Sequence, residues 1–231
     1  MLLLSDLHLD LHAFDPLKSV DFDVVILASD IHDPGTSGIE WTRRADKFGV
    51  TTPVVMVAGN HEYYDTVMPT ERANMQLAAA GTNVPMLDGH EAVIDGVRFL
   101  GCTLWTDFAV HIEVGAKVVG KPRIMSNPGK ALTYVENSLN DYQLIQMDVV
   151  KDDGVELEDS LVPIRHAARR LRGADTLAIH MEQRAWLKSK LEEPLDGATV
   201  VVTHHAPHRG SQASRYADDW SSTGFIVSVW S

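Results

Sequence analysis

The sequence contains four short apolar runs, and each is followed by a cluster of Asp, Asn or His side chains. These runs limit the possible folds of the chain more than any other pattern in it. The runs cover residues 2–4, 24–28, 53–58 and 198–203, and they are followed by SDLHLD, SDIHD, GNHEYY and HHAPH. Near-continuous runs of Val, Ile and Leu of this length are typical of buried strands that are covered on both faces. The sequence therefore predicts four buried strands, each of which delivers polar side chains at its carboxyl end.

Segments with a helical pattern lie between these strands, at about 37–48, 66–80, 130–146 and 176–191. Residues 91–105 have the pattern of a hairpin that turns at Asp95–Gly96, and the acidic stretch 151–159 is expected to be an exposed loop. Strands that alternate with helices indicate an α/β layered fold. In such folds ligands bind beyond the carboxyl ends of the strands, which is where all four polar clusters fall.

The charge balance limits the classes of partner. The 231 residues include 20 Lys and Arg against 32 Asp and Glu, which gives a formal charge of −12. A chain this acidic argues against the broad basic surface that sequence-independent nucleic-acid binding requires. It still admits a small anionic substrate, because a bound metal ion can dominate the electric field around it.

Apolar runs and cysteine usage bear on localisation and on domain organisation. No apolar run approaches the roughly 20 residues of a membrane span, and nothing resembles a secretory signal. The single cysteine, Cys102, excludes an intrachain disulfide framework and fits a reducing compartment. We therefore expect a cytoplasmic protein without a membrane partner. Since no repeat or linker is evident, we expect one domain over residues 1–231.

The first two clusters offer carboxylates and imidazoles. In an extended segment, residues i and i+2 point the same way, so Asp6 and His8 can reach one ion. Asp30 follows the second run and Asp33 lies three residues later, so that one carboxylate could bridge two metals and the other could orient a histidine. Taken alone, a D-x-H pair also occurs in ordinary polar loops, and Asp30 and Asp33 could equally be loop-start or N-cap residues.

The third and fourth clusters add an amide and further imidazoles. Asn60 offers a neutral carbonyl ligand, and His61 can donate or accept a proton near pH 7. A turn capped by Asn60 would explain the same residues without any chemistry. Adjacent strand residues point to opposite faces, so only one of His204 and His205 is expected to meet a metal. The other is expected to pack, cap a turn or contact substrate.

Taken in order, the four clusters resemble the motifs of the calcineurin-like metallophosphoesterase superfamily. The matching segments are D-x-H at 6–8, S-D-x-x-D at 29–33, G-N-H-E at 59–62 and H-H-x-P at 204–207. The resemblance implies an α/β fold, a layered sandwich of two mixed β-sheets that face one another and are flanked by helices. It also implies hydrolysis of phosphomonoesters or phosphodiesters by attack of a metal-bridging hydroxide.

The resemblance further implies a site for two divalent transition metal ions. Asp6 and His8 would bind one metal, Asp30 would bridge both, and Asn60 and His204 would bind the second. Mixed carboxylate, imidazole and amide ligands suit Mn²⁺, Fe or Zn²⁺ better than an all-oxygen Mg²⁺ site. The sequence does not choose among these three metals.

Other residues receive catalytic and substrate-binding roles. The resemblance implies that His61 protonates the leaving oxygen or stabilises the transferring phosphoryl group, with Asp33 orienting its ring. Three residues near the end of the fourth cluster, His205, His208 and Arg209, are candidate contacts for the phosphate of a small ester. Simple solvation at the surface is the alternative for Arg209.

This chain departs from the family pattern in two places. The glycine that usually precedes the bridging aspartate is Ser29, and no G-H-x-H motif, which supplies one histidine to each metal, occurs anywhere in the sequence. We therefore expect a C-terminally shortened member that lacks the last strands of the fold. Water could fill the vacant positions, another histidine (His12, His32, His205 or His208) could substitute, or a second copy of the chain could complete the site and cover the exposed sheet edge.

Two other functions remain open at this point. The first is a non-catalytic binding or regulatory module that keeps the fold without its metals, which the missing G-H-x-H motif favours. The second is a metal-dependent nuclease on the same fold, which the formal charge of −12 disfavours. The residues from Asp6 to His204 that match the family motifs favour the enzyme.

Overall fold

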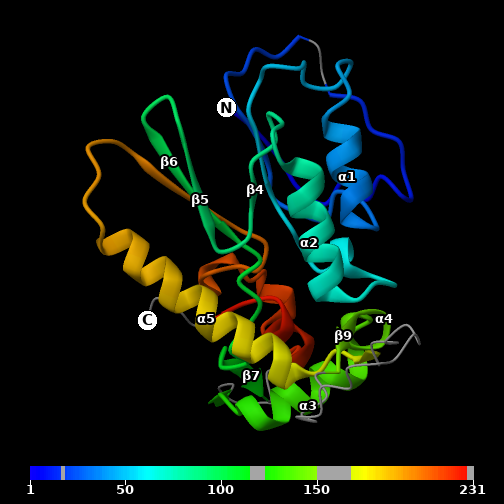
Figure 1. Cartoon of the computed structure of the whole chain (residues 1–231). Helices are drawn as coiled ribbons and strands as arrows, with labels where there is room; N and C mark the ends of the chain where they lie inside the picture. The colour runs from blue at the N-terminus through cyan, green and yellow to red at the C-terminus, as the bar shows by residue number, and fades with distance from the viewer. Residues whose placement is uncertain (17–18, 115–122, 150–167, 228–231) are drawn as a thin grey trace, which may run out of the picture.

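The computed structural model describes residues 1–16, 19–114, 123–149 and 168–227, and its two main sheets lie face to face. Helices α1 (Gly35–Thr42) and α2 (Met68–Ala79) cover the outer face of the first sheet, and α5 (Gly173–Glu192) packs on the outer face of the second. Figure 1 shows this arrangement with α1 and α2 beside β4 (Met86–Leu87) and with α5 running below the hairpin of the second sheet. The α/β layered fold predicted from the sequence is confirmed.

The first sheet is wholly parallel in the described part of the chain. Its order is β1 (Leu2–Leu4), β2 (Val25–Leu27), β3 (Val54–Val57) and β4, with Leu3 opposite Ile26 and Ile26 opposite Val55. The carboxyl ends of parallel strands meet at one edge of the sheet, so the first three polar clusters are brought together there. The expectation that both sheets are mixed is wrong for this sheet, because each of its connections runs through a crossover that returns the chain in the same direction.

Strands β2 and β3 are buried on both faces, as their continuous apolar sequences predict. Val25 and Leu27 pack in the core under α1 and α2, whereas Ile26 points into the core between the two sheets. Val55 and Val57 of β3 belong to this core between the sheets, together with Phe99 and Val202 of the facing sheet. Successive residues of each strand face opposite sides of the sheet.

The second sheet is mixed. Strand β11 (Thr199–Thr203) runs parallel to β6 (Val97–Cys102), which pairs in an antiparallel hairpin with β5 (His90–Ile94). The hairpin turns at Asp95 and Gly96, which both have positive φ (49° and 79°) as a tight two-residue turn requires, so the predicted hairpin is confirmed.

The two sheets come into close contact at Gly101, next to the end of β6. A Cβ atom at this position would overlap the Leu87 side chain of β4 and lie 2.9 Å from Cγ2 of Val57. Glycine is therefore required here for close packing between the sheets. The outer face of the same strand buries Cys102 against Leu187 of α5, and this burial raises the pKa of the thiol to about 12.

Several sequence expectations differ from the structure. The helix expected over 130–146 is two helices, α3 (Pro128–Ser138) and α4 (Asp141–Leu144), because Leu139 takes an extended conformation between them. The helix expected over 37–48 is α1, which ends at Thr42. The pattern of the hairpin extends to residue 105, but its second strand ends at Cys102. The loop expected over 151–159 lies outside the described residues.

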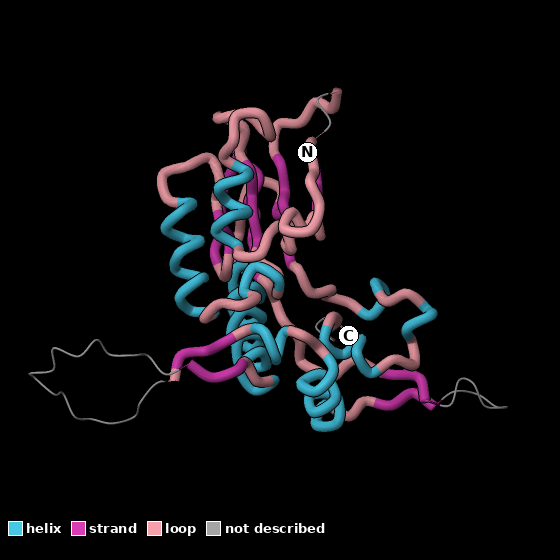
Figure 2. Tube along the Cα trace, turned by 90° about the vertical axis from the view of Figure 1, so that its right-hand side faces the viewer, coloured by secondary structure: helices cyan, strands magenta, loops and turns pink. Residues whose placement is uncertain are grey.

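Two small antiparallel pairs complete the described elements. They are β7 (Ile112–Val114) with β8 (Arg123–Met125), and β9 (Gln146–Asp148) with β10 (Ala168–Arg170). Figure 2 shows both pairs projecting from the end of the molecule that carries α3. Within the described ranges, no helix combines the length and the apolar character that a membrane crossing requires.

Candidate metal centre

The first three polar clusters converge at the carboxyl edge of the parallel sheet. The loop after β1 lies on the loop after β2, since Asp6 N–H donates to Ser29 O (3.0 Å) and His8 N–H donates to Asp30 O (3.1 Å). All four of these residues have positive φ, between 44° and 83°. Non-glycine residues rarely adopt this conformation, and it concentrates at functional sites because the surrounding structure must hold it there.

Three of the predicted site residues form one group. His8, Asp30 and His61 each offer a ligand atom, and these atoms all lie within 4.8 Å of one another. The His8 and His61 rings meet edge to face with centroids 4.5 Å apart, and the buried Nδ1 of His8 has no hydrogen-bond partner in the described part of the protein. A buried nitrogen without a partner is costly, and a bound cation beside it would remove that cost.

A second group adjoins the first through Asp30. His204 Nε2 lies 2.8 Å from Asn60 Oδ1 and 3.6 Å from Asp30 Oδ2. Asp30 therefore stands between His8 and His61 on one side and His204 and Asn60 on the other. Asp6 lies in the loop after β1. Its side chain is exposed, and the Ser5 hydroxyl contacts its carboxylate.

The hydroxyl of Ser29 contacts the ring of His204. Its oxygen lies 2.7 Å from His204 Nδ1. With Nδ1 beside Ser29, the Nε2 atom is directed at Asn60 Oδ1 and at the Asp30 carboxylate. This orientation is the one that a metal-binding imidazole needs. The departure from the family pattern at Ser29 is thus compatible with a ligand role for His204.

Asp141 and Tyr64 fix the amide of Asn60. Asn60 Nδ2 donates to Asp141 Oδ1 (2.8 Å) and to the Tyr64 hydroxyl (3.1 Å), and that hydroxyl donates to Asp141 Oδ1 (2.7 Å). Both amide protons are occupied, so Asn60 Oδ1 must face His204. In the sequence, Asp141 stands in the polar segment Asn140-Asp141-Tyr142, which indicates a turn at a helix end or a place in the lining of the site, but not this contact with Asn60.

Glu62 joins the loops that carry Asp30 and Asn60. Its side chain is fully buried, and its carboxylate accepts from three backbone N–H groups, those of Gly59 (2.6 Å), Ile31 (2.6 Å) and Asp30 (3.0 Å). Burial raises the pKa of Glu62, and the three donors act against this shift. In the sequence Glu62 is visible only as the last letter of the G-N-H-E segment, without an indication of this role.

Gly59 allows the loop after β3 to pass directly over Asp30. A Cβ atom at Gly59 would overlap Asp30 Oδ1 and would lie 3.0 Å from Cε1 of His204. We expect Gly59→Ala to displace the Asp30 carboxylate and to weaken Mn²⁺ binding by about 10- to 100-fold, the usual cost of disturbing groups that support metal ligands. Isothermal titration calorimetry measures this, with Gly129→Ala as the control because a Cβ atom there would meet Asn127 Oδ1 at an ordinary contact distance of 3.8 Å. Equal affinities of the two variants would contradict the expectation.

Burial also controls the charge of the site's histidines. Desolvation, with the His61 and His8 rings nearby, lowers the pKa of His204 to about 4, whereas desolvation and Glu62 raise the pKa of Asp30. Both shifts disfavour a charged group in the metal-free site. Divalent cations would reverse the penalty on the Asp30 carboxylate and would bind the neutral form of His204.

The shift at His204 predicts a pH dependence for the metal-free protein. The folded pKa lies below the unfolded value of 6.5, so the neutral ring stabilises the fold above pH 6.5, and this contribution is lost as pH falls toward 4. Between pH 7 and 4 we expect the wild type to lose on the order of 2–3 kcal/mol more unfolding free energy than His204→Gln. Urea unfolding in chelator at three pH values measures the difference. Parallel pH profiles would contradict it.

Asp33 and His61 are not joined by a hydrogen bond or an ion pair in the part of the chain that the structure describes. Burial, with Asp10 and Asp65 nearby, raises the pKa of Asp33 to about 6. The His61 ring instead stacks on Tyr64, with centroids 4.2 Å apart, and burial together with His8 lowers the pKa of His61. Tyr64 therefore orients His61 in this structure, and the orienting role of Asp33 stays a prediction.

The histidines of the fourth cluster separate as the alternation of a strand predicts. His204 faces the metal centre, whereas His205 is buried beside Trp105, with centroids 5.2 Å apart and Nδ1 3.2 Å from Thr103 O. His208 Nδ1 accepts from the Gly210 backbone and caps a short turn.

The remaining candidates lie outside the two groups of ligands described above. Arg209 contacts Glu113 at 3.4 Å, His12 is exposed, and His32 Nδ1 lies 2.8 Å from the backbone oxygen of Asp33. None of these three side chains contacts the Asp30 carboxylate within the described residues. The phosphate-contact role of Arg209 and the substitute-ligand roles of His12 and His32 stay predictions.

Comparisons with known proteins bear on the family and the fold of the chain. A family model described as calcineurin-like phosphoesterase matches residues 1–224. No curated protein matches the chain. Among solved structures, the phosphopantetheinyl hydrolase from Mycobacterium tuberculosis superposes with a TM-score of 0.64 at 17% sequence identity, over 98% of this chain and 74% of that one. At this identity the likeness indicates a shared fold.

Proposed function

This chain belongs to the calcineurin-like phosphoesterase family, and from that membership we propose that it is a metal-dependent hydrolase of phosphomonoesters or phosphodiesters. The observation that carries the proposal is the position of Asp30 between two groups of side chains, with the ligand His8 beside His61 on one side and the ligands Asn60 and His204 on the other. A buried carboxylate shared by two sets of nitrogen and oxygen donors is suited to bridge two cations.

The donor set fits divalent transition metals. Asp6 and His8 would hold one ion, Asn60 and His204 the other, and Asp30 both, which gives the mixture of oxygen and imidazole donors that Mn²⁺, Fe and Zn²⁺ accept. The partnerless Nδ1 of His8 supports this assignment. When bound, such ions lower the pKa of a water molecule and neutralise the charge of the phosphate oxygens.

His61 is the proposed proton donor. Its ring lies beside the first group of ligands and stacks on Tyr64, which places the imidazole at the edge of the site. Burial and His8 lower its pKa in the free protein. A phosphate anion bound beside the ring would raise that pKa again and would favour the protonated form, which can donate to the leaving oxygen.

A second candidate function is a binding module of the same fold. The sequence contains no G-H-x-H motif, so the two histidines that the family adds to its metals have no counterpart of that form. Such a module would bind metal weakly or not at all and would hydrolyse no ester. The measurement of turnover and of metal content together separates the two functions.

The proposal is tested by hydrolysis of p-nitrophenyl phosphate and bis-p-nitrophenyl phosphate with and without Mn²⁺. We expect Mn²⁺-dependent turnover that His61→Ala reduces by about 10²- to 10⁴-fold with little change in metal content, because general acid catalysis contributes an effect of this size. His90→Ala, at an exposed histidine of β5, is the control and should retain full activity. Absence of metal-stimulated turnover in the wild type would refute the enzyme, and full activity of His61→Ala would refute the acid role.

A further inference from the structure

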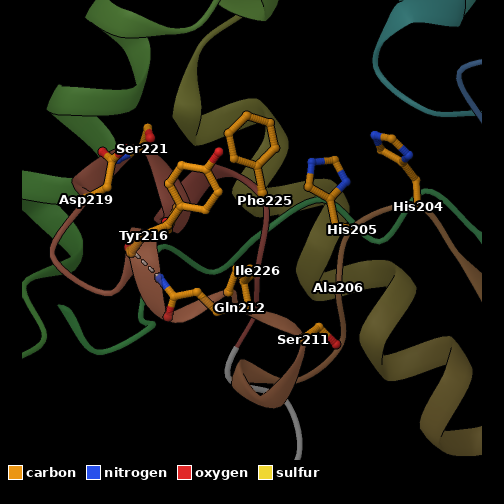
Figure 3. A pocket seen from close by; sticks show the side chains of 12 residues that line it. His204, His205, Ala206, Ser211, Gln212, Tyr216, Asp219, Ser221, Phe225 and Ile226 are labelled. Atoms are coloured by element: carbon orange, nitrogen blue, oxygen red, sulfur yellow. Dashed lines mark hydrogen bonds between the residues drawn. The ribbon is translucent and has the colours of Figure 1, made fainter. Parts of the chain in front are cut away.

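A pocket of about 520 Å³ has His204 and His205 in its wall and leads away from the metal centre. Figure 3 shows the two imidazoles at one end and Tyr216, Asp219 and Ser221 at the other. The volume falls within the ~300–1,000 Å³ typical of small-molecule sites. Resting on the proposed function, we propose that this pocket receives the organic group of the phosphate ester, and that it selects esters whose organic group carries no negative charge.

The lining of the pocket is apolar or polar without a positive charge. Apart from the two histidines it consists of Ala, Ser, Gln, Tyr, Phe and Ile residues and a single acid, Asp219. No lysine or arginine is among the described residues that line it. Serine hydroxyls and the Gln212 amide can bond to hydroxyl or amide groups of a ligand, whereas a second phosphate or a carboxylate would find no cation there.

The one acid in the wall is held in place. Asp219 Oδ1 accepts from the backbone N–H of Ser221 at 2.9 Å, so the carboxylate caps the 3₁₀ turn Trp220–Gly224. An anionic group on the ligand would be repelled by it at short range, and a partly enclosed pocket weakens the screening by water. Asp219 thus acts as a specificity-determining residue against anionic organic groups.

Two arginines that lie near lining residues in the sequence do not line the pocket themselves. Arg209 contacts Glu113 at 3.4 Å, and the Arg215 guanidinium lies over the Tyr216 ring, 4.8 Å from its centroid. Since Asp219 is the one acid among the described lining residues, the exclusion of negative charge falls to Asp219.

Hydrogen bonds to the backbone fix the segment that carries Phe225. Ala206 N–H donates to Phe225 O (2.9 Å), Val227 N–H donates to Ala206 O (3.0 Å), and the Thr106 hydroxyl donates to Thr223 O (2.5 Å). The Phe225 ring is nevertheless 43% exposed. An aromatic ring on a fixed backbone at the wall of a pocket is prepared to pack on the apolar part of a ligand without an entropic cost of ordering the loop.

Binding of phosphonates, which cannot be hydrolysed, tests the inference independently of turnover. The probes are benzylphosphonate, 4-carboxybenzylphosphonate and methylphosphonate, titrated calorimetrically into the Mn²⁺-loaded protein. We expect the wild type to bind benzylphosphonate at least about tenfold more tightly than its carboxylated analogue, because like charges in a binding site are strongly unfavourable. Asp219→Asn, which keeps the acceptor for Ser221 N–H, should reduce this preference to less than about threefold.

Phe225→Ala tests the apolar contact. It should weaken benzylphosphonate about five- to tenfold and leave methylphosphonate within about twofold, because only the larger probe reaches the ring. Tyr134→Ala, at an aromatic residue of similar exposure that does not line the pocket, is the matched control and should change neither affinity.

Three results would overturn the inference: equal wild-type affinities for the two benzyl phosphonates, an unchanged preference in Asp219→Asn, or no binding of either probe. Selective binding without hydrolysis of any ester would support the pocket and refute the proposed function. Hydrolysis with equal binding of the charged and uncharged probes would refute the pocket alone.

Discussion

Asp30→Asn is expected to abolish metal-dependent hydrolysis, with a fall in kcat/KM of at least about 1,000-fold. Asp30 adjoins both His61, from whose backbone N–H it accepts at 3.2 Å, and His204, whose Nε2 lies 3.6 Å away. An asparagine keeps the volume and the acceptor for His61 but removes the negative charge. The loss therefore reports on the bridging charge and not on the packing of the loops.

The same substitution should stabilise the protein when metal is removed. Burial and the neighbouring Glu62 raise the pKa of Asp30, so its ionisation opposes folding increasingly as pH rises above the unfolded value of 3.8. In chelator at pH 8, Asp30→Asn should melt at a higher temperature than the wild type. Asp196→Asn, at an exposed aspartate between α5 and β11, is the control for both measurements and should change neither. Retained turnover in Asp30→Asn would contradict the bridging role.

Glu62→Ala is expected to give the largest loss of stability, about 3–5 kcal/mol, because three buried N–H groups lose their acceptor at once. The three donors belong to Gly59, Ile31 and Asp30, so the loops after β2 and β3 should both loosen. Glu62→Gln should lose less, since one amide oxygen can still accept. Urea unfolding in chelator, compared with the wild type, measures both variants.

Glu71 provides the matched control for this prediction. Its side chain is also buried, but it accepts from a single backbone N–H, that of Thr36 at 2.9 Å. Glu71→Ala should therefore cost about 1–2 kcal/mol. Equal losses in Glu62→Ala and Glu71→Ala would show that the three bonds to Glu62 do not act together as described.

The sequence predicts the parts of this protein that depend on local pattern. Continuous β-branched and apolar residues such as Val25–Leu27 are typical of a strand with two covered faces, and parallel strands bring their carboxyl ends to one edge. The convergence of His8, Asp30 and His61 follows from these two rules. The Asp95–Gly96 turn is predictable for a similar reason, since few other residue pairs accept positive φ twice in succession.

The parts that sequence analysis missed depend on contacts between distant segments. Asp141 holds an amide 81 residues away in the sequence, and Ser29 contacts a histidine ring 175 residues away. Neither residue has a local pattern that distinguishes it from an ordinary capping or loop residue. The break at Leu139 is also non-local, because the residues around it have a continuous helical pattern, and α3 packs against the 3₁₀ turn Trp220–Gly224 near the chain's end.

The metal content of the protein decides whether Asp30 is shared by two metal ions. The wild type and Asp30→Asn are each incubated with Mn²⁺, dialysed against metal-free buffer and measured by elemental analysis at equal protein concentration. We expect bound metal in the wild type and close to none in Asp30→Asn, since both groups of ligands share that carboxylate. A wild-type protein that retains no metal, or a variant that retains as much as the wild type, would contradict this expectation.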